Sequence, residues 1–391
     1  MKVNILKKNI TRTTRLLKDK AHSKRAVAPP IYQTSLFSFE KYSDLEESFC
    51  GIGDHEIYSR VRNPTVSLFE EKVAELEGGE AAAAFACGMG AISGVIMELA
   101  EQGDRIVTVK HTYPDAYRFM KQLCKKFGMT TEFVDGTDLD AIEKSIQGAK
   151  LLYLESPGSF MMEEQNLAAI ATLAKKHGVI TIIDNSWSTP FLQNPIELGI
   201  DVVIHSASKY ISGHSDVVAG IAVSRQELIT EIKRNSTALL GAKLSAHEAG
   251  LLLRGLRTLP VRLKQHQESA LIIIDKLVRH PAVAKVYHPY VDKKDFSTLQ
   301  GYSSLLSIDL ADDIDVIKFC DAFEIFHIGV SWGGYESLVL PALASIKRGG
   351  EFNSAVDFNL SPQCVRLFIG LEDVNDLWSD IENALEKAKK A

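Results

Sequence analysis

Short apolar segments that alternate with amphipathic segments constrain the fold of this 391-residue chain more than any other feature. Runs such as 105–109, 151–154 and 179–183 are almost entirely apolar, and helix-like segments such as 166–177 separate them. Continuous apolar strands joined through helices are typical of a parallel sheet that is buried on both faces. We therefore expect an α/β fold with a mostly parallel central sheet covered by helices.

The domain organisation follows from where this alternation begins and ends. Residues 1–58 show little periodicity and are predicted to form an irregular N-terminal arm, 59–250 an α/β domain, and 251–391 a smaller α+β domain. The charged segment 382–390 is predicted to be an amphipathic terminal helix. The expected strands are 81–86, 105–109, 131–134, 151–154, 179–183, 201–205, 305–308 and 365–369, and helical patterns begin at Pro64 and cover 91–100, 116–127, 166–177 and 251–278.

Composition excludes several classes of protein. The 44 lysines and arginines against 50 acidic residues give a net charge of −6, which argues against binding to nucleic acid or to a membrane surface through bulk charge. No apolar run reaches the roughly 18 residues of a membrane span. The basic first 15 residues lack the apolar core of a secretory signal. Five widely spaced cysteines without a C-x-x-C motif fit neither a disulfide framework nor a zinc site, so we expect a reducing cytoplasm.

A glycine-bearing turn after the first expected strand is a candidate phosphate site. Cys87-Gly-Met-Gly90 precedes a helical segment, and backbone N–H groups at a helix start bind phosphate. The spacing through Gly94 is G-x-G-x-x-x-G, and no acidic residue ends the following strand at Val109. Both features depart from the dinucleotide fingerprint. The turn therefore favours a mononucleotide-sized phosphate over NAD, although the glycines could simply close the turn.

Two further strand ends carry polar residues. Asp184 ends one strand, where it either caps the following turn or holds a fixed negative charge against a cationic ligand nitrogen. The loop after the next strand contains Ser206, Ser208 and Lys209, which could supply two hydroxyl donors to a phosphate and an amine. The alternative for Lys209 is an exposed loop lysine.

The histidines near this loop allow a metal site to be considered. His205 and His214 flank the loop, but no third ligand stands at a suitable spacing, so we interpret both as structural and expect no metal.

Arg366 lies within an apolar strand, where desolvating a guanidinium is costly. It either forms a structural ion pair or binds the carboxylate of a ligand as a bidentate fork. Phosphate donors, an acid, an amine and a carboxylate fork are together what a pyridoxal phosphate (PLP) enzyme acting on amino acids requires.

Three motifs resemble one family of such enzymes. Ile183-Asp-Asn-Ser-Trp187, Ser206-Ala-Ser-Lys-Tyr210 and Arg254-Gly-Leu-Arg-Thr258 are similar to the cystathionine γ-synthase-like PLP enzymes of cysteine and methionine metabolism, and the resemblance extends from about Thr34 to Leu377. It implies PLP fold type I, and a homotetramer built as a dimer of dimers. It also implies a small amino-acid thioether as substrate, with no nucleic acid or membrane partner.

The resemblance also implies roles for individual residues. Lys209 would be the Schiff-base lysine and general base, Asp184 the partner of the pyridine nitrogen, and Tyr113 a stacking platform and second candidate proton donor. The remaining implied contacts are Gly88, Met89, Ser206 and Ser208 to the phosphate, Tyr58 and Arg60 to the phosphate and substrate of a neighbouring subunit, and Ser331, Trp332 and Arg366 to the substrate.

The resemblance points to β-elimination of cystathionine, giving homocysteine, pyruvate and ammonia. Glu155-Ser-Pro-Gly-Ser159, the segment 331–338 and Ile369-Gly-Leu-Glu-Asp373 resemble the bacterial cystathionine β-lyase branch. Arg60-Val-Arg-Asn-Pro-Thr65 instead resembles the γ-lyases, whereas His111-Thr-Tyr-Pro-Asp115 lacks the cysteine of methionine γ-lyases. A cystathionine γ-lyase, a cysteine desulfhydrase or a γ-synthase is thus the alternative. From another class, a nicotinamide-dependent oxidoreductase is disfavoured by the missing fingerprint.

Overall fold

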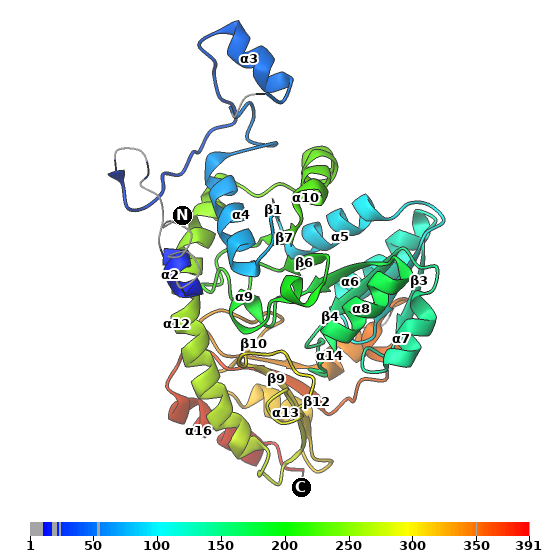
Figure 1. The fold of residues 1–391 in the computed structure, drawn as a ribbon. Helices are drawn as coiled ribbons and strands as arrows, with labels where there is room; N and C mark the ends of the chain where they lie inside the picture. Colours follow the sequence, from blue (N-terminus) through cyan, green and yellow to red (C-terminus); the bar gives the residue numbers. More distant parts are fainter. Residues whose placement is uncertain (1–10, 18–21, 23–24, 53–54, 349, 391) are drawn as a thin grey trace.

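The computed structural model describes residues 11–17, 22, 25–52, 55–348 and 350–390. Within these residues it contains a seven-stranded sheet in the order β1-β7-β6-β5-β4-β2-β3 and a five-stranded sheet in the order β10-β11-β12-β9-β8. Figure 1 shows the larger sheet and its helices above the smaller sheet. The expected fold class, a mostly parallel central sheet covered by helices with a smaller C-terminal sheet unit, is confirmed.

The larger sheet is parallel over most of its width. Strands β6, β5, β4, β2 and β3 pair in parallel, and all of them except the edge strand β3 are buried along nearly their whole length. The strands are β1 (Ala81–Phe85), β2 (Arg105–Val109), β3 (Thr130–Val134), β4 (Leu151–Glu155), β5 (Ile180–Asp184), β6 (Val202–His205) and β7 (Gly220–Ser224). The carboxyl ends of the five parallel strands therefore meet at one edge of the sheet, where ligands bind in open α/β sheets.

Strand β7 was not predicted; it lies between β1 and β6 and runs antiparallel to both. Its glycine and alanine content is low in strand propensity, because small side chains add little packing on a pleated surface. Hydrogen-bonded pairing with β1 and β6 nevertheless holds this segment as a strand, and Ala83 of β1, for example, pairs with Ala222.

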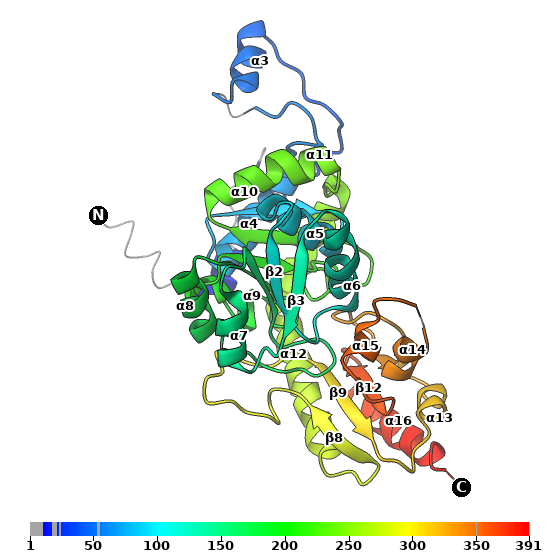
Figure 2. The same ribbon diagram turned by 90° about the vertical axis from the view of Figure 1, so that its right-hand side faces the viewer.

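Helices cover both faces of this sheet (Figure 2). One face packs against α7 (Leu139–Ile146) and α8 (Leu167–His177), and the other against α5 (Gly88–Leu99) and α10 (Gln226–Ile232). The remaining helical segments of this unit are α4 (Pro64–Glu77), α6 (Pro114–Arg118), the π-helical η2 (Phe119–Cys124), α9 (Thr189–Leu192), the 3-10 helix η3 (Pro195–Leu198), the π-helical η4 (Lys233–Thr237) and α11 (Ala238–Leu240).

Two helices of the larger unit begin at other residues than predicted. The helix expected over 91–100 begins at Gly88, because the Cys87 Sγ accepts a hydrogen bond from the Gly90 N–H and so caps the helix three residues earlier. The single helix expected over 116–127 is instead α6 followed by the π-helical η2, and α6 starts at Pro114, whose fixed φ suits the first helical position.

The long helix α12 (Ala246–Leu277) contacts elements of both sheet units and contains Pro260. Ser245 and Glu248 form a reciprocal capping box at its start, which satisfies two N–H groups that the helix leaves unpaired. The helix therefore begins five residues before the periodic segment at 251–278.

The smaller sheet packs against helices that follow α12 in sequence. Its strands are β8 (Val283–Tyr287), β9 (Leu305–Leu310), β10 (His327–Ile328), β11 (Leu338–Pro341) and β12 (Cys364–Phe368), and its helices are α13 (Val316–Asp321), α14 (Ala342–Lys347), α15 (Ser354–Asp357) and α16 (Val374–Lys387). The terminal helix was predicted too short. It begins at Val374, because Asp373 caps it, and its Leu377 and Ile381 are buried in the core of this unit.

The N-terminal arm was predicted to be wholly irregular, and this was wrong where the structure describes it. It contains α2 (Arg12–Leu17) and α3 (Tyr42–Phe49), while Leu36 pairs with Tyr58 in an isolated bridge. Figures 1 and 2 both show α3 standing away from the rest of the molecule. Residues 1–10, 18–21, 23–24 and 53–54 of this arm lie outside the described part. Among the described residues, no helix combines the length and apolarity that crossing a bilayer requires.

Candidate active site

Two buried carboxylates lie side by side at the carboxyl edge of the larger sheet. Asp184 is the last residue of β5, and its register partner on β4 is Glu155. The Asp184 Oδ1 accepts hydrogen bonds from the Ser186 N–H at 2.9 Å and from the Ser186 hydroxyl at 2.6 Å, while Oδ2 receives neither. Burial raises the pKa of Asp184, and burial together with Asp184 raises the pKa of Glu155 to about 8. Burial therefore disfavours the ionised form of both acids, and a cationic group at this edge would favour it.

Lys209 lies in the loop that follows β6, and its amine faces the smaller sheet unit. Its Nζ donates a hydrogen bond to the Ser331 hydroxyl at 2.9 Å and lies 5.5 Å from the centre of the Trp332 ring. Burial, aided by the charge of Arg366, lowers the pKa of Lys209 to about 8. A substantial fraction of this amine is consequently neutral at slightly alkaline pH, as a nucleophile requires.

The start of α5 and the loop after β6 form a cradle for an anion. A Cβ on Gly88 would lie 2.9 Å from the Ser206 hydroxyl oxygen, so the two segments meet closely only because residue 88 is glycine. The first backbone N–H groups of a helix have no partner within the helix. Met89 follows in the same turn, while the Ser208 hydroxyl is bonded to the backbone of Ala219. The cradle thus offers N–H donors and the Ser206 hydroxyl.

Arg366 lies in the middle of β12, buried, with its guanidinium near the same place. It donates to the Val330 carbonyl at 2.9 Å and lies 5.2 Å from the centre of the Phe160 ring. Among the described residues no carboxylate is within ion-pair distance of it, and the charge of Glu155 only partly offsets the effect of burial on its pKa. Burial lowers its pKa to about 10, so it stays cationic at neutral pH. This geometry favours the carboxylate fork over the structural ion pair.

Tyr113 closes one side of the site. Its backbone N–H donates to the Glu155 carboxylate at 2.7 Å, and its hydroxyl donates to Asp115 at 3.2 Å. The ring remains partly exposed, and burial raises the pKa of the hydroxyl to about 12. The group is therefore a neutral proton donor at physiological pH.

A buried polar network supports the carboxyl ends of β5 and β6 from the side of α4. His205 Nε2 lies 3.3 Å from the carboxylate of Glu77, the last residue of α4, and Asn185 donates to the same carboxylate at 3.0 Å. Both His205 and Glu77 are almost fully buried. His205 follows β6 directly into the Ser206 loop and Asn185 follows Asp184, so the network joins the two segments that carry site residues.

Tyr58 and Arg60 are not brought to Lys209 within one chain. They line a separate cavity of about 510 Å³ together with Lys243, and the Arg60 guanidinium donates to the Ala238 carbonyl at 2.6 Å. Tyr58 is exposed, as is much of the arm around it. A role for these residues would have to be played in another subunit's site.

Sequence reasoning named Glu155 only as part of a motif and missed its position at the centre of the site. The signal was available, because Glu155 ends an apolar strand in the same way as Asp184. The contribution of Glu77 could not be predicted, since it is one of several glutamates on an amphipathic helix and only the fold buries it.

The arrangement fits PLP. The Gly88–Ser206 cradle suits its phosphate, the Asp184 carboxylate its pyridine nitrogen, the Lys209 amine its aldehyde and the Tyr113 ring its aromatic face. The nearby Arg366 suits the carboxylate of an amino acid. The fold and site thus define a PLP enzyme of amino-acid metabolism.

Comparisons with known proteins agree. The family described as Cys/Met metabolism PLP-dependent enzyme matches residues 11–386. The chain is 36% identical over 369 residues to L-methionine gamma-lyase of Pseudomonas putida, covering 92% of this chain and 93% of that one. It is 35% identical over 378 residues to cystathionine beta-lyase of Lactococcus lactis subsp. cremoris, covering 93% and 94%. Its fold superposes on cystathionine gamma synthase of Xanthomonas oryzae pv. oryzae with a TM-score of 0.89 and 32% identity, covering 97% and 98%.

The chain therefore belongs to the Cys/Met metabolism family of PLP-dependent enzymes. It is an enzyme of the carbon–sulfur lyase and synthase group within PLP fold type I, and its cofactor is pyridoxal 5′-phosphate. Family membership confirms the resemblance that the sequence motifs indicated.

Proposed function

We propose that this enzyme cleaves the Cβ–S bond of cystathionine to release homocysteine, and that one water hydrolyses the remaining three-carbon fragment to pyruvate and ammonia. One observation carries the proposal: Ser331 accepts from Lys209, and the adjacent Val330 carbonyl accepts from Arg366. A guanidinium held beside an amine suits an amino acid whose carboxylate binds Arg366 while its Cα lies next to Lys209. PLP, when bound, supplies an electron sink for the charge left at the substrate Cα.

The side chains of this chain would divide the work as follows. Arg366 binds the α-carboxylate, with Ser331 and Trp332 beside it, and fixes the Cα–H bond toward Lys209. The Lys209 Nζ takes the Cα proton, and its lowered pKa suits a base that works near neutrality. The Asp184 carboxylate holds a proton on the pyridine nitrogen.

Cleavage of the Cβ–S bond leaves electron density on a departing thiolate, which needs a proton. Lys209 can deliver to this sulfur the proton that it removed from Cα, so that elimination needs no further proton donor. The Tyr113 hydroxyl, neutral because its pKa is raised, is the second donor within the site. We assign Tyr113 mainly to stacking.

Supporting observations favour the β-lyase over the γ-lyase reaction, and one favours the reverse. Trp332, beside the Lys209 amine, and Ser159 belong to segments that resemble the β-lyase branch. The 36% identity to a protein named L-methionine gamma-lyase instead favours a γ-lyase reaction. Cystathionine γ-cleavage is therefore the second candidate function.

Product analysis with cystathionine separates the two candidates. Pyruvate with homocysteine is the expected result, whereas 2-oxobutyrate with cysteine would overturn β-cleavage in favour of γ-cleavage. Borohydride reduction of the PLP-loaded enzyme followed by peptide mapping should place the cofactor on Lys209. A label on any other lysine would overturn the assignment of the site.

We further propose that the active unit is a homotetramer, a dimer of dimers, in which Tyr58 and Arg60 reach the phosphate and substrate of a neighbouring subunit. Large apolar side chains are exposed on the arm, among them Leu36, Tyr42 and Phe49, and such a surface is costly in water unless a partner covers it. We retain residues 1–58, 59–250 and 251–391 as the arm and the two domains, and the cytoplasm as the expected compartment.

A further inference from the structure

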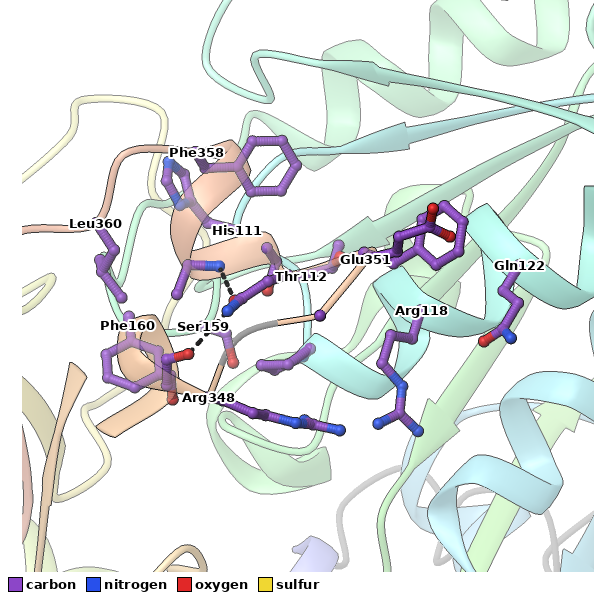
Figure 3. Close-up of a pocket in the computed structure, with 17 residues that line it drawn as sticks. His111, Thr112, Arg118, Gln122, Ser159, Phe160, Arg348, Glu351, Phe358 and Leu360 are labelled. Carbon is purple, nitrogen blue, oxygen red and sulfur yellow. Dashed lines mark hydrogen bonds between the residues drawn. The ribbon is translucent and has the colours of Figure 1, made fainter. Parts of the chain in front are cut away.

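A second cavity lies beside the candidate active site, between the larger sheet unit and the smaller one. It has a volume of about 250 Å³, and its walls come from residues 111–118 at the start of α6, from Ser159 and Phe160, and from residues within 345–348 and 350–360 (Figure 3). None of the residues to which we assign PLP or substrate contacts lines it. The cavity therefore lies outside the set of residues that we assign to the cofactor and to the substrate α-carboxylate.

Two guanidinium groups point toward each other across this cavity. Figure 3 shows the side chains of Arg118 and Arg348 converging, while the Glu351 carboxylate points away from them. Arg118 has one ion pair, to Asp115 at 3.5 Å, and among the described residues Arg348 has none. Two cations that converge without an acid between them repel each other, and an anion placed between them would remove that cost.

The rest of the wall indicates what kind of anion would fit. Pro114, Phe160, Phe358 and Leu360 are apolar, so the cavity suits a ligand with a short hydrocarbon part. Thr112 also belongs to the wall, and its buried hydroxyl has no hydrogen-bond partner among the described residues. A ligand that contributes an acceptor would satisfy this donor, because a buried unpaired hydroxyl is costly.

We infer that this cavity is a binding site for a small carboxylate, held by Arg118 and Arg348. Arginine binds carboxylates through paired N–H donors, which two converging guanidinium groups supply. The cavity wall includes both Thr112 and Pro114, the neighbours of Tyr113. An occupant therefore contacts the turn that holds Tyr113 in the site. This inference goes beyond the proposed function and does not depend on which thioether is cleaved.

Calorimetric titration of the PLP-loaded enzyme with sodium butyrate tests the inference. Butyrate could also bind Arg366, so the titration is made in an Arg366→Met background, where binding should remain and uncharged butyramide should not bind. Adding Arg348→Met should weaken butyrate binding about tenfold or more, as expected for loss of a charged hydrogen-bond donor. Lys347→Met, which removes a neighbouring exposed charge outside the cavity wall, should leave it unchanged.

Two results would overturn the inference: no butyrate binding in the Arg366→Met background, or equal weakening by Arg348→Met and Lys347→Met. Thr112→Val gives an independent check, because it keeps the side-chain volume and removes the hydroxyl. It should lower butyrate affinity several-fold, and an unchanged affinity would remove Thr112 from the site.

The carboxylate could belong to a free acid or to the far end of a substrate, and kinetics distinguish these sources. Cystathionine carries a carboxylate at its far end, whereas S-methylcysteine does not. If Arg348→Met lowers kcat/KM for cystathionine alone, the site serves the substrate. If kcat/KM for both is unchanged while butyrate binding is lost, it serves a free acid. Failure of the proposed function would instead show as absence of pyruvate from either thioether, with butyrate binding intact.

Discussion

At the scale of single residues, the site depends on groups whose charge is set by burial. Lys209 and Glu155 are both moved toward their neutral forms, since taking a charged group out of water disfavours ionisation. Arg366 remains cationic despite burial and lacks an acid within ion-pair distance among the described residues. A substrate carboxylate would supply the missing counter-charge, which explains why a costly buried arginine is retained.

Replacing Lys209 by alanine should lower turnover of cystathionine by at least about three orders of magnitude, because the variant lacks both the nucleophile and the base. Pyruvate release measured with a coupled assay checks this. Lys125→Ala removes an exposed lysine that lines neither the site nor the cavity of Tyr58 and Arg60, and serves as the control for folding. Near-normal activity of Lys209→Ala would reject the mechanism.

Replacing Glu155 by glutamine should change how stability depends on pH. The folded pKa of Glu155 is raised to about 8, so its contribution is complete at acid pH and is lost as pH rises toward and through 8. Glutamine stays neutral and still accepts the Tyr113 N–H. The variant should therefore gain unfolding free energy over the wild type between pH 5 and pH 9, as measured by urea unfolding of the unloaded protein.

The exposed Glu132 provides the matched control for that experiment. Glu132 lies on β3 and forms an ion pair with Arg105 at the surface, where solvent screens the charge. The control variant is Glu132→Gln. Its stability difference from the wild type should vary little over the same pH range. A pH-independent difference for Glu155→Gln would show that Glu155 is ionised throughout.

At the scale of elements, the position of the chemistry is decided by how α4 supports two strand ends. Glu77, the last residue of α4, is bonded to both Asn185 and His205, which adjoin Asp184 and Ser206. The helix ends at Gly78, whose φ of 83° permits the left-handed turn that returns the chain to β1. Helix and strand ends are thereby held as one unit.

Replacing Glu77 by glutamine should destabilise the protein by roughly 1–3 kcal/mol, because an amide has one acceptor oxygen where the carboxylate has two, so the contact to Asn185 or the contact to His205 is lost. PLP affinity, measured by absorbance during dialysis, should fall as well, since the Asp184 and Ser206 segments lose a common support. Glu75→Gln on the exposed face of the same helix is the control and should change neither quantity. Loss of stability with unchanged PLP affinity would limit Glu77 to a structural role.

At the scale of the whole molecule, one chain does not bring every expected site residue together. Tyr58 and Arg60 lie in a cavity with Lys243, and the arm that carries them extends beyond the body of the molecule. If they serve a neighbouring subunit, two inactive variants can complement each other, because a mixed dimer contains one complete site.

Mixing Arg60→Ala with Lys209→Ala after dissociation and reassembly should therefore restore activity to about a quarter of the wild-type value, the share of intact sites for random pairing. Mixing Lys209→Ala with Asp184→Asn should restore none, because both residues belong to the same chain's site. Absence of restoration in the first mixture, with exchange of subunits verified by light scattering and labelled chains, would place Arg60 in its own chain's site.

Local pattern in the sequence determined the fold class, the strands β2 and β5, and the set of polar residues at the strand ends. Each of these depends on short-range chemistry: apolar runs exclude water along a strand, and Asp184, Lys209 and Arg366 stand out because charge is costly in apolar surroundings. The motifs also indicated the family, because together they specify one cofactor chemistry.

Only the tertiary structure decided which residues meet. It placed Glu155 beside Asp184, buried Glu77 under His205, inserted β7 between β1 and β6, and opened a cavity between Arg118 and Arg348. In the chain, 230 positions separate Arg118 from Arg348, and nothing in either local segment encodes the other. Such contacts arise from the packing of whole elements, and packing depends on the complete arrangement of side chains rather than on any window of sequence.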